Sequence, residues 1–109
     1  MKMLLTPGVL AELADRFKAL GEPNRLTILS ALRADEMTVT ELVDETGLGQ
    51  ANVSKHLNIL FRFGFVERRK DGLNVYYSLA DKDVFRICEI MCGRLENEVS
   101  RLKQVVNGR

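Results

Sequence analysis

The chain has 109 residues, which fits one domain of common size and leaves no room for a catalytic domain beside a separate regulatory one. Hydrophobic residues make up 46% of the chain and charged residues 28%, a globular composition that excludes a disordered tail. The sequence contains no run of about 18 apolar residues and no signal peptide, so it predicts a cytoplasmic protein without a membrane span.

Charge is distributed unevenly, although the net charge is only +1. Residues 35–46 carry five acidic and no basic side chains, whereas residues 47–79 carry five basic and two acidic ones. Because phosphate binding needs local rather than global charge, the basic stretch is a weak indication of a nucleic-acid partner. On charge alone, two ordinary solvated surfaces are the better explanation.

The first third of the chain predicts two helices. Apolar residues recur every three or four positions from Val9, which predicts a helix with one buried face that ends at Gly21. Pro23 suits the first position of a helix, where its missing N–H costs nothing, so a second helix is expected from there to about Arg33.

A short third helix and a longer fourth helix are expected next. Thr38 and Glu41 have the spacing of a capping box, which predicts a helix over 40–46 that stops at Gly47. A tight connection then leads to a helix over 50–63. Its inward side is expected to hold Val53, Leu57, Leu60 and Phe61.

A β-hairpin is predicted over 65–79, because Asp71-Gly72 between two strand-like runs is a strong hairpin signal. A last helix is expected over 81–106, capped by Asp81. Its apolar stripe is too long for so small a domain to cover, which predicts a homodimer. The residues expected in this dimer interface are Phe85, Cys88, Cys92, Leu95, Val99 and Leu102.

The order of these elements is that of a winged helix-turn-helix that reads double-stranded DNA, a mainly α fold with a β-hairpin wing. Amide side chains pair with adenine, and Lys donates to guanine or phosphate, so a polar helix face suits base reading. The expected contacts on the helix are Gln50, Ala51, Asn52, Ser54, Lys55 and His56. Those on the hairpin, which would touch the backbone or minor groove, are Arg68, Arg69, Lys70 and Asn74.

Four segments resemble the ArsR/SmtB family of bacterial and archaeal transcriptional repressors, and the likeness covers about residues 10–95. They are LGEPNRLTIL at 20–29, VSKHLNIL at 53–60, GFV at 64–66 and VYYSL at 75–79. The resemblance implies a homodimer joined through the first and last helices, bound to an inverted-repeat operator and released by an effector. It also implies that the segment 50–58 enters the major groove and that 68–74 is the wing. Gly49 departs from the family, which usually has Ser there.

The resemblance also places two metal sites of the family on this sequence, and neither set of ligands is present. The thiolate site would need cysteines near Val43 and Glu45, where there are none. The zinc site of the last helix would fall on Asp81, Asp83, Arg94 and Asn97, of which two cannot bind zinc. The sequence therefore predicts no confident metal site.

Cys88 and Cys92 stand four residues apart, on one face of the last predicted helix. One interpretation makes them small hydrophobic residues in the dimer seam. The other makes them a thiol sensor for a soft metal or metalloid ion such as arsenite, or for oxidation or persulfidation. Persulfide sensors of the resembling family usually place one cysteine near the second helix, where this chain has none, so an ion is preferred.

Two other classes of function compete with the repressor. An enzyme is disfavoured because the sequence has no Gly-rich phosphate loop, no metal-ligand cluster, and one His without a nucleophile at a recognisable spacing. A winged-helix module that binds proteins and has lost DNA binding is the stronger alternative, since a fold does not dictate its function.

Overall fold

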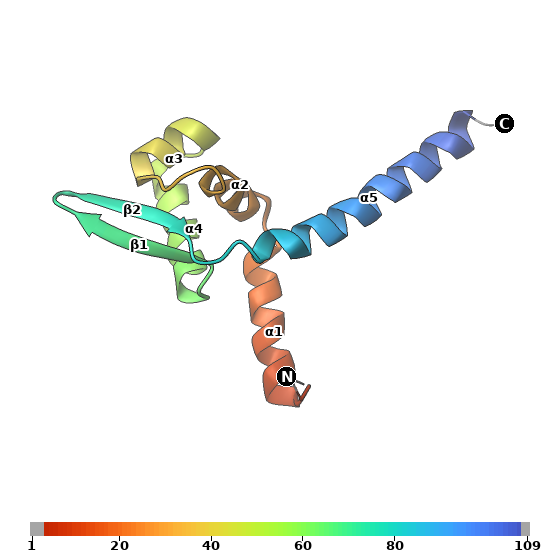
Figure 1. The fold of residues 1–109 in the computed structure, drawn as a ribbon, viewed down its shortest axis with the longest axis horizontal. Helices are drawn as coiled ribbons and strands as arrows, with labels where there is room; N and C mark the ends of the chain where they lie inside the picture. Colours follow the sequence, from red (N-terminus) through yellow and green to blue (C-terminus); the bar gives the residue numbers. More distant parts are fainter. Residues whose placement is uncertain (1–3, 108–109) are drawn as a thin grey trace.

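The computed structural model describes residues 4–107, which form five helices and one antiparallel hairpin (Figure 1). This arrangement confirms the predicted mainly helical class with a β-hairpin. No helix in this described range is long and apolar enough to cross a membrane. The elements are α1 (Pro7–Leu20), α2 (Pro23–Leu32), α3 (Val39–Thr46), α4 (Gln50–Arg62), β1 (Val66–Asp71), β2 (Asn74–Leu79) and α5 (Val84–Asn107).

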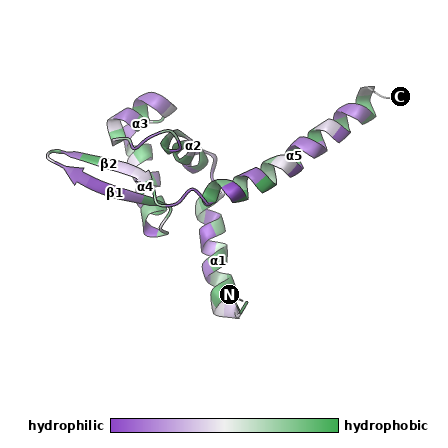
Figure 2. Cartoon of the chain, in the orientation of Figure 1, coloured by the Kyte–Doolittle hydropathy of each residue, from purple (hydrophilic) through white to green (hydrophobic). Residues whose placement is uncertain are grey.

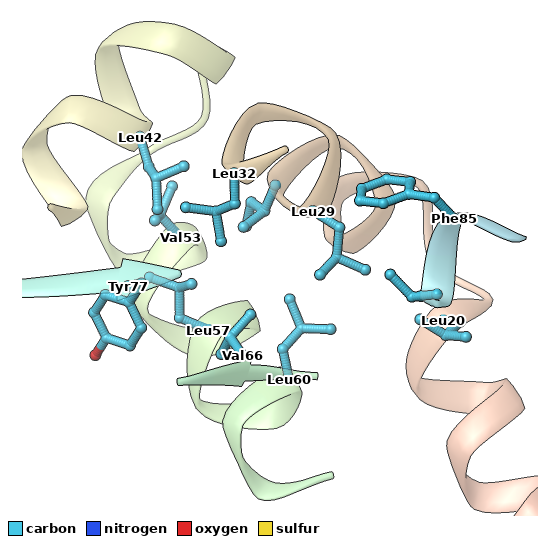
Figure 3. Close-up of a cluster of buried hydrophobic side chains, with 12 residues drawn as sticks. Leu20, Leu29, Leu32, Leu42, Val53, Leu57, Leu60, Val66, Tyr77 and Phe85 are labelled. Carbon is cyan, nitrogen blue, oxygen red and sulfur yellow. The ribbon is translucent and has the colours of Figure 1, made fainter. Parts of the chain in front are cut away.

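The hydrophobic core lies between α2, α3, α4 and the base of the hairpin (Figure 3). Each element contributes the apolar side of its own periodic pattern, so the core is a direct consequence of the 3.6-residue and two-residue repeats. The side chains with less than 2% exposure are Ile28, Leu29, Leu42, Val53, Leu57, Leu60 and Val66.

The helix ends carry caps that fix where each helix begins and stops. The predicted capping box is confirmed: Glu41 N–H donates to Thr38 Oγ1 at 3.2 Å, and Thr38 N–H donates to Glu41 Oε1 at 3.0 Å. Gly47 ends α3 with a φ of 76°, a left-handed conformation that favours glycine. The sharp turn that follows brings α4 across α3, as in a helix-turn-helix.

The hairpin turn lies one residue later than the sequence suggested. Asp71 pairs with Asn74 across the strands, so the two loop residues are Gly72 and Leu73. Only Gly72 has a positive φ, 63°, which is the pattern of a type II′ turn with Gly in its first central position. Met37 ties the hairpin to the helices by two backbone hydrogen bonds with Tyr77, of 2.9 and 2.8 Å.

Helices α1 and α5 extend away from the core in different directions (Figure 1). The radius of gyration is 17.2 Å, whereas a compact domain of this length has about 13 Å. Leu20 anchors the end of α1, and Val84 and Phe85 anchor the start of α5. The rest of α5 shows apolar and polar residues in alternating patches (Figure 2), with no core of its own chain against it.

Helix α5 begins at Val84, three residues later than predicted. The expectation that Asp81 caps this helix is wrong. Its Oδ1 instead accepts a hydrogen bond from Asp83 N–H at 2.7 Å, which closes a small turn ahead of the helix.

Candidate nucleic-acid interface

Helix α4 is held by one buried side and leaves the opposite side to solvent. Val53, Leu57 and Leu60 have no exposed surface and pack into the core. These positions repeat at three- and four-residue steps, which directs the polar residues on the opposite side of the helix outward. The polar side of α4 is therefore fixed in place by the best-buried residues of the chain.

The polar side of α4 makes no side-chain hydrogen bond within residues 4–107, so its amides and its lysine can bind an external ligand. Ser54 is half-buried, and the other side chains of the predicted contact set are exposed apart from His56. The exposed members are Gln50, Ala51, Asn52 and Lys55. Gly49 caps the helix without a side-chain hydrogen bond, which leaves backbone N–H groups facing outward at this end.

Two further polar residues lie on the same side of α4: Asn58, which ends the segment 50–58 that the resemblance assigned to the major groove, and Arg62, which was not among the predicted contacts. Asn58 and Arg62 are exposed and continue the line that runs through Ala51 and Lys55 at four- and three-residue steps. The helical repeat of the sequence was a sufficient signal to find Arg62. It extends the polar side by about one turn beyond the segment 50–58.

His56 does not belong to the exposed side, so its expected place among the DNA contacts is wrong. Its exposure is 6%, and its Nε2 lies 3.7 Å from Glu22 Oε2 at the start of α2. Its Nδ1 is buried without a hydrogen-bond partner among the described residues. Burial lowers the pKa of His56 below its ordinary 6.5, against the opposing effect of Glu22.

The basic side chains of β1 alternate between the two faces of the hairpin, with different neighbours on each. Arg68 stacks on the ring of Phe61, its guanidinium carbon 4.0 Å from the ring centroid. Phe61 was predicted to point inward, but it is 38% exposed and supports this arginine at the surface. The stack places the charge of Arg68 beside the polar side of α4.

Arg69 lies on the other face, where acidic side chains engage it. Its Nη2 donates to Glu36 Oε1 at 2.6 Å, and its Nη1 lies 3.6 Å from Asp71 Oδ2. It also stacks on Tyr76 at 4.8 Å. Lys70 and Asn74, by contrast, are exposed near the tip and make no side-chain hydrogen bond or ion pair in the described chain.

The apolar stripe of α5 is exposed from its second turn onward. Leu95, Val99 and Leu102 are 59%, 43% and 64% exposed. Phe85, which was predicted to share this stripe in a dimer interface, is instead buried in the core of its own chain. The expectation is wrong for this residue because the first turn of α5 packs against α2, where Arg33 covers the Phe85 ring at 4.7 Å.

Both cysteines line an open, mainly apolar groove of about 570 Å³ between α5 and the end of α1. Cys88 is half-buried and Cys92 is exposed, and both are free thiols. Met91 lines the same groove between them. No group of three or more His, Cys, Asp or Glu residues able to hold a metal ion occurs within residues 4–107.

Comparison with known proteins gives consistent matches. The family model described as bacterial regulatory protein, arsR family, matches residues 22–68. A transcriptional repressor SmtB homolog of Synechocystis is 36% identical over 85 residues, 78% of this chain and 64% of that protein. A probable mercury resistance operon repressor of Streptomyces lividans is 40% identical over 68 residues, 62% of this chain and 54% of that protein. The chain thus spans less than two thirds of the length of these two relatives.

A solved structure from Mycobacterium bovis shares the fold with a TM-score of 0.74 and 30% sequence identity. The match covers 86% of this chain and 87% of that one. That protein is described as a homodimeric winged helix-turn-helix DNA-binding domain and a possible ArsR-family transcriptional regulator. The family and the fold are those of transcriptional regulators and not of enzymes.

Proposed function

This chain belongs to the ArsR family of bacterial regulatory proteins, and on that premise we propose that it is a homodimeric, sequence-specific repressor that binds double-stranded DNA. The observation that carries the proposal is the polar side of α4. Its side chains make no internal hydrogen bonds, although the helix that presents them is fixed by fully buried residues. A rigid helix with free polar groups is what base reading requires.

Base reading follows from the residue types on that side. The major groove is about 12 Å wide and admits one α-helix. Gln50 and Asn52 carry amides that can pair bidentately with adenine, and Lys55 can donate to guanine. Asn58 and Arg62 lie further along, where the helix leaves the groove and meets phosphates. The unoccupied N–H groups at Gln50 favour a phosphate at the other end.

The wing supplies contacts of a different kind. Arg68 and Lys70 lie on the same face of β1, and neither is paired with a carboxylate in the described chain, so both can neutralise phosphates. Arg69 would first have to leave Glu36, to which it is bound at 2.6 Å. We therefore assign Arg68 and Lys70 to the DNA backbone ahead of Arg69.

Dimerisation is proposed from the exposed stripe of α5 together with α1. An apolar face of this length in water is covered by a partner in stable proteins, and a second copy of the chain offers the same stripe. Two copies related by a twofold axis carry two α4 helices, which match an inverted-repeat operator. The homodimer described for the M. bovis neighbour supports this arrangement.

The effector is proposed to be a soft metal or metalloid ion at Cys88 and Cys92. Side chains four residues apart on a helix have Cβ atoms about 5–6 Å apart, whereas a disulfide needs about 3.5–4.5 Å. This spacing suits an ion held between two thiolates better than a bond between the sulfurs. The mercury resistance named for the S. lividans relative supports this class of effector.

The repressor is tested by retardation of the DNA fragment upstream of its own gene, over a range of salt concentrations. Binding is expected to weaken steeply with salt, and Asn52→Ala should lose about 1–3 kcal/mol of discrimination at one base pair of each half-site. A module that binds only proteins would give no shift even at low salt. An unchanged operator affinity of a dimeric Asn52→Ala variant would contradict the assignment of α4.

The effector site is tested by titrating the protein–DNA complex with arsenite, cadmium and an organic polysulfide. Release of the wild-type protein, but not of the variant with both cysteines replaced by serine, is the expected result. Release by polysulfide alone would mean that the effector acts by oxidation or persulfidation of a thiol and is not an ion. If none of the three releases the wild-type protein, the two cysteines are interface residues and the effector acts elsewhere.

A further inference from the structure

His56 is a buried polar residue, although it was expected to contact DNA from the exposed side of α4. It sits on α4, one residue after the exposed Lys55, yet it is 6% exposed and turned toward the start of α2. Burying an imidazole with an unpartnered Nδ1 costs free energy, and an apolar side chain would fill the space without that cost. The Glu22 carboxylate lies 3.7 Å from its Nε2, a separation that allows charge attraction but is too long for a hydrogen bond.

Glu22 connects two helices through a single oxygen. Its Oε2 accepts a hydrogen bond from Arg25 N–H at 3.0 Å, which caps the first turn of α2. The same oxygen lies 3.7 Å from His56 Nε2 on α4. The α2 cap thus lies beside His56 of α4, where the two side chains interact by charge rather than by a hydrogen bond.

Arg25 continues the connection in the other direction, to the end of α1. Its Nε donates to Ala19 O at 2.7 Å, and its Nη2 donates to Lys18 O at 3.5 Å. Both oxygens belong to the last turn of α1, where carbonyls have no partner within the helix, and Lys18 O also accepts a hydrogen bond from Gly21 N–H at 3.2 Å. The guanidinium thus serves as the C-terminal cap of one helix while it belongs to the first turn of the next.

These contacts matter because few others fix α1; one of the few is Arg16, whose guanidinium carbon lies 5.9 Å from the centroid of the Phe63 ring at the end of α4. Ala19 and Leu20 are its only buried residues among those described, and the rest of the helix is half-buried or exposed. A helix attached mainly at one end takes its direction from the contacts at that end. The caps at the junction of α1 and α2 are therefore well placed to set its angle.

We propose that Glu22, Arg25 and His56 form a positioning relay that fixes the angle between α1 and α4. The inference rests on the proposed function, in which α1 joins the dimer interface and α4 reads DNA. Under that premise the relay determines the distance and rotation between the two reading helices of the dimer. Its residues are positioning residues and touch no base.

The relay predicts an effect on half-site spacing that a general loss of stability would not produce. One added base pair rotates the half-sites by about 35° and separates them by about 3.4 Å. A rigid dimer discriminates against that change, whereas a dimer with a loose α1 tolerates it. Recognition of bases within each half-site should not depend on the relay.

The test uses a duplex that the wild-type protein selects from a random-sequence pool, together with versions carrying one base pair more or fewer between the half-sites. Fluorescence anisotropy gives the ratio of affinities for the original and altered spacing. Arg25→Gln and Glu22→Gln should each lower this ratio about five- to tenfold, while discrimination against a changed base within a half-site persists. The glutamine at position 22 keeps the capping oxygen and removes only the charge.

A matched control is Asp15→Asn, which removes an exposed carboxylate of the same helix α1 that forms no ion pair within residues 4–107. It should leave the spacing ratio unchanged. If Arg25→Gln does not fold in a thermal unfolding assay, His56→Leu carries the test, because it fills the same space without the polar contact. An unchanged ratio in folded variants, or an equal loss at every spacing, would overturn the relay. If the wild-type protein selects no DNA from the pool, that result would contradict the proposed function itself, on which the relay rests.

Discussion

Helices α4 and α5 are both amphipathic, but they use their two sides in opposite ways. Helix α4 turns its apolar side into its own chain, where Leu57 and Leu60 have no exposed surface, and leaves its polar side to solvent. Helix α5 leaves its apolar side exposed, with Leu95 and Leu102 at 59% and 64%. The apolar side of α4 is buried within one chain. The apolar side of α5 stays exposed in one chain and would be buried by the second chain of the proposed dimer.

This difference assigns the presentation of polar groups to α4 and the proposed contact with a partner to α5, within a chain of 109 residues. The part of the chain from α2 to β2 forms a core of its own and can hold polar groups rigidly on its surface. The two projecting helices contribute little to that core, and they are free to be arranged by a partner. Substitutions in the two regions should therefore have different effects on stability, dimerisation and DNA binding.

The largest effect is expected from Leu95→Asp, which places a charge in the middle of the exposed α5 stripe. The charge has to be desolvated if the stripe is covered, so the variant should be monomeric at micromolar concentration and should lose DNA binding. Sedimentation measures the first result and anisotropy the second. Leu73→Asp is the matched control, since Leu73 is fully exposed at the hairpin tip and should leave the dimer intact. A dimeric Leu95→Asp variant would contradict the role of α5.

Leu57→Ala tests the other region, because it removes a side chain with no exposed surface from the core. The cavity and the lost burial should cost about 2–5 kcal/mol in the free energy of unfolding. Leu102→Ala should also lower stability, but by an amount that depends on protein concentration, since in the proposed dimer its contacts lie between chains. Denaturant titrations at two concentrations distinguish the cases. If the stability of both variants depends on protein concentration in the same way, the proposed difference between the core and the α5 stripe is wrong.

The two wing arginines should differ in their contribution to DNA binding. Arg68→Gln should reduce the slope of log affinity against log salt by about one, because it removes one phosphate contact. Arg69→Gln should change the slope less, since Arg69 is held by Glu36 at 2.6 Å in the free protein. Anisotropy titrations at four or more salt concentrations measure both slopes. Equal changes in slope would mean that Arg69 leaves Glu36 when DNA binds.

The smallest effect is expected from the pH dependence of stability. Burial lowers the pKa of His56 below 6.5, so as pH falls through 6.5 the unfolded chain takes up a proton before the folded chain does. Stability should therefore decrease on acidification through this range. Glu22 favours the charged imidazole, while Arg25 and Lys55 disfavour it.

His56→Gln isolates this contribution, because His56 is the only histidine of the chain. Urea midpoints measured at about pH 7.5 and about pH 5.5 should differ less for the variant than for the wild-type protein. A variant with the same difference as the wild type would assign the pH dependence to other groups.

The helices, the capping box and the hairpin could be predicted because each depends on residues close together in the sequence. Thr38 and Glu41 cap α3 within one turn, and the apolar repeat of α4 identifies its buried side. The same repeat could have identified Arg62 as a continuation of the polar side. Local periodicity and capping were sufficient for these features.

The details that were not predicted depend on contacts between distant residues. His56 lies three residues after Val53 and four before Leu60, so the apolar repeat of α4 already indicated its burial, whereas its neighbour Glu22, 34 residues earlier, is brought to it only by the fold. Arg69 looks like a free cation until the fold brings Glu36 beside it, 33 residues away. Phe85 fits the stripe of α5 by spacing, but the first turn of that helix packs into the core. The contacts of Arg69 with Glu36 and of Phe85 with the core leave no signal in the local sequence.

A footprint of the wild-type protein on the DNA upstream of its own gene tests the central claim most directly. The account predicts two protected segments of related, inverted sequence, with centres one or two helical turns apart, about 10 or 20 base pairs. This pattern requires both a reading helix that recognises bases and a dimer that holds two of them. A single protected segment would contradict the dimer, and no protection at low salt would contradict DNA binding itself.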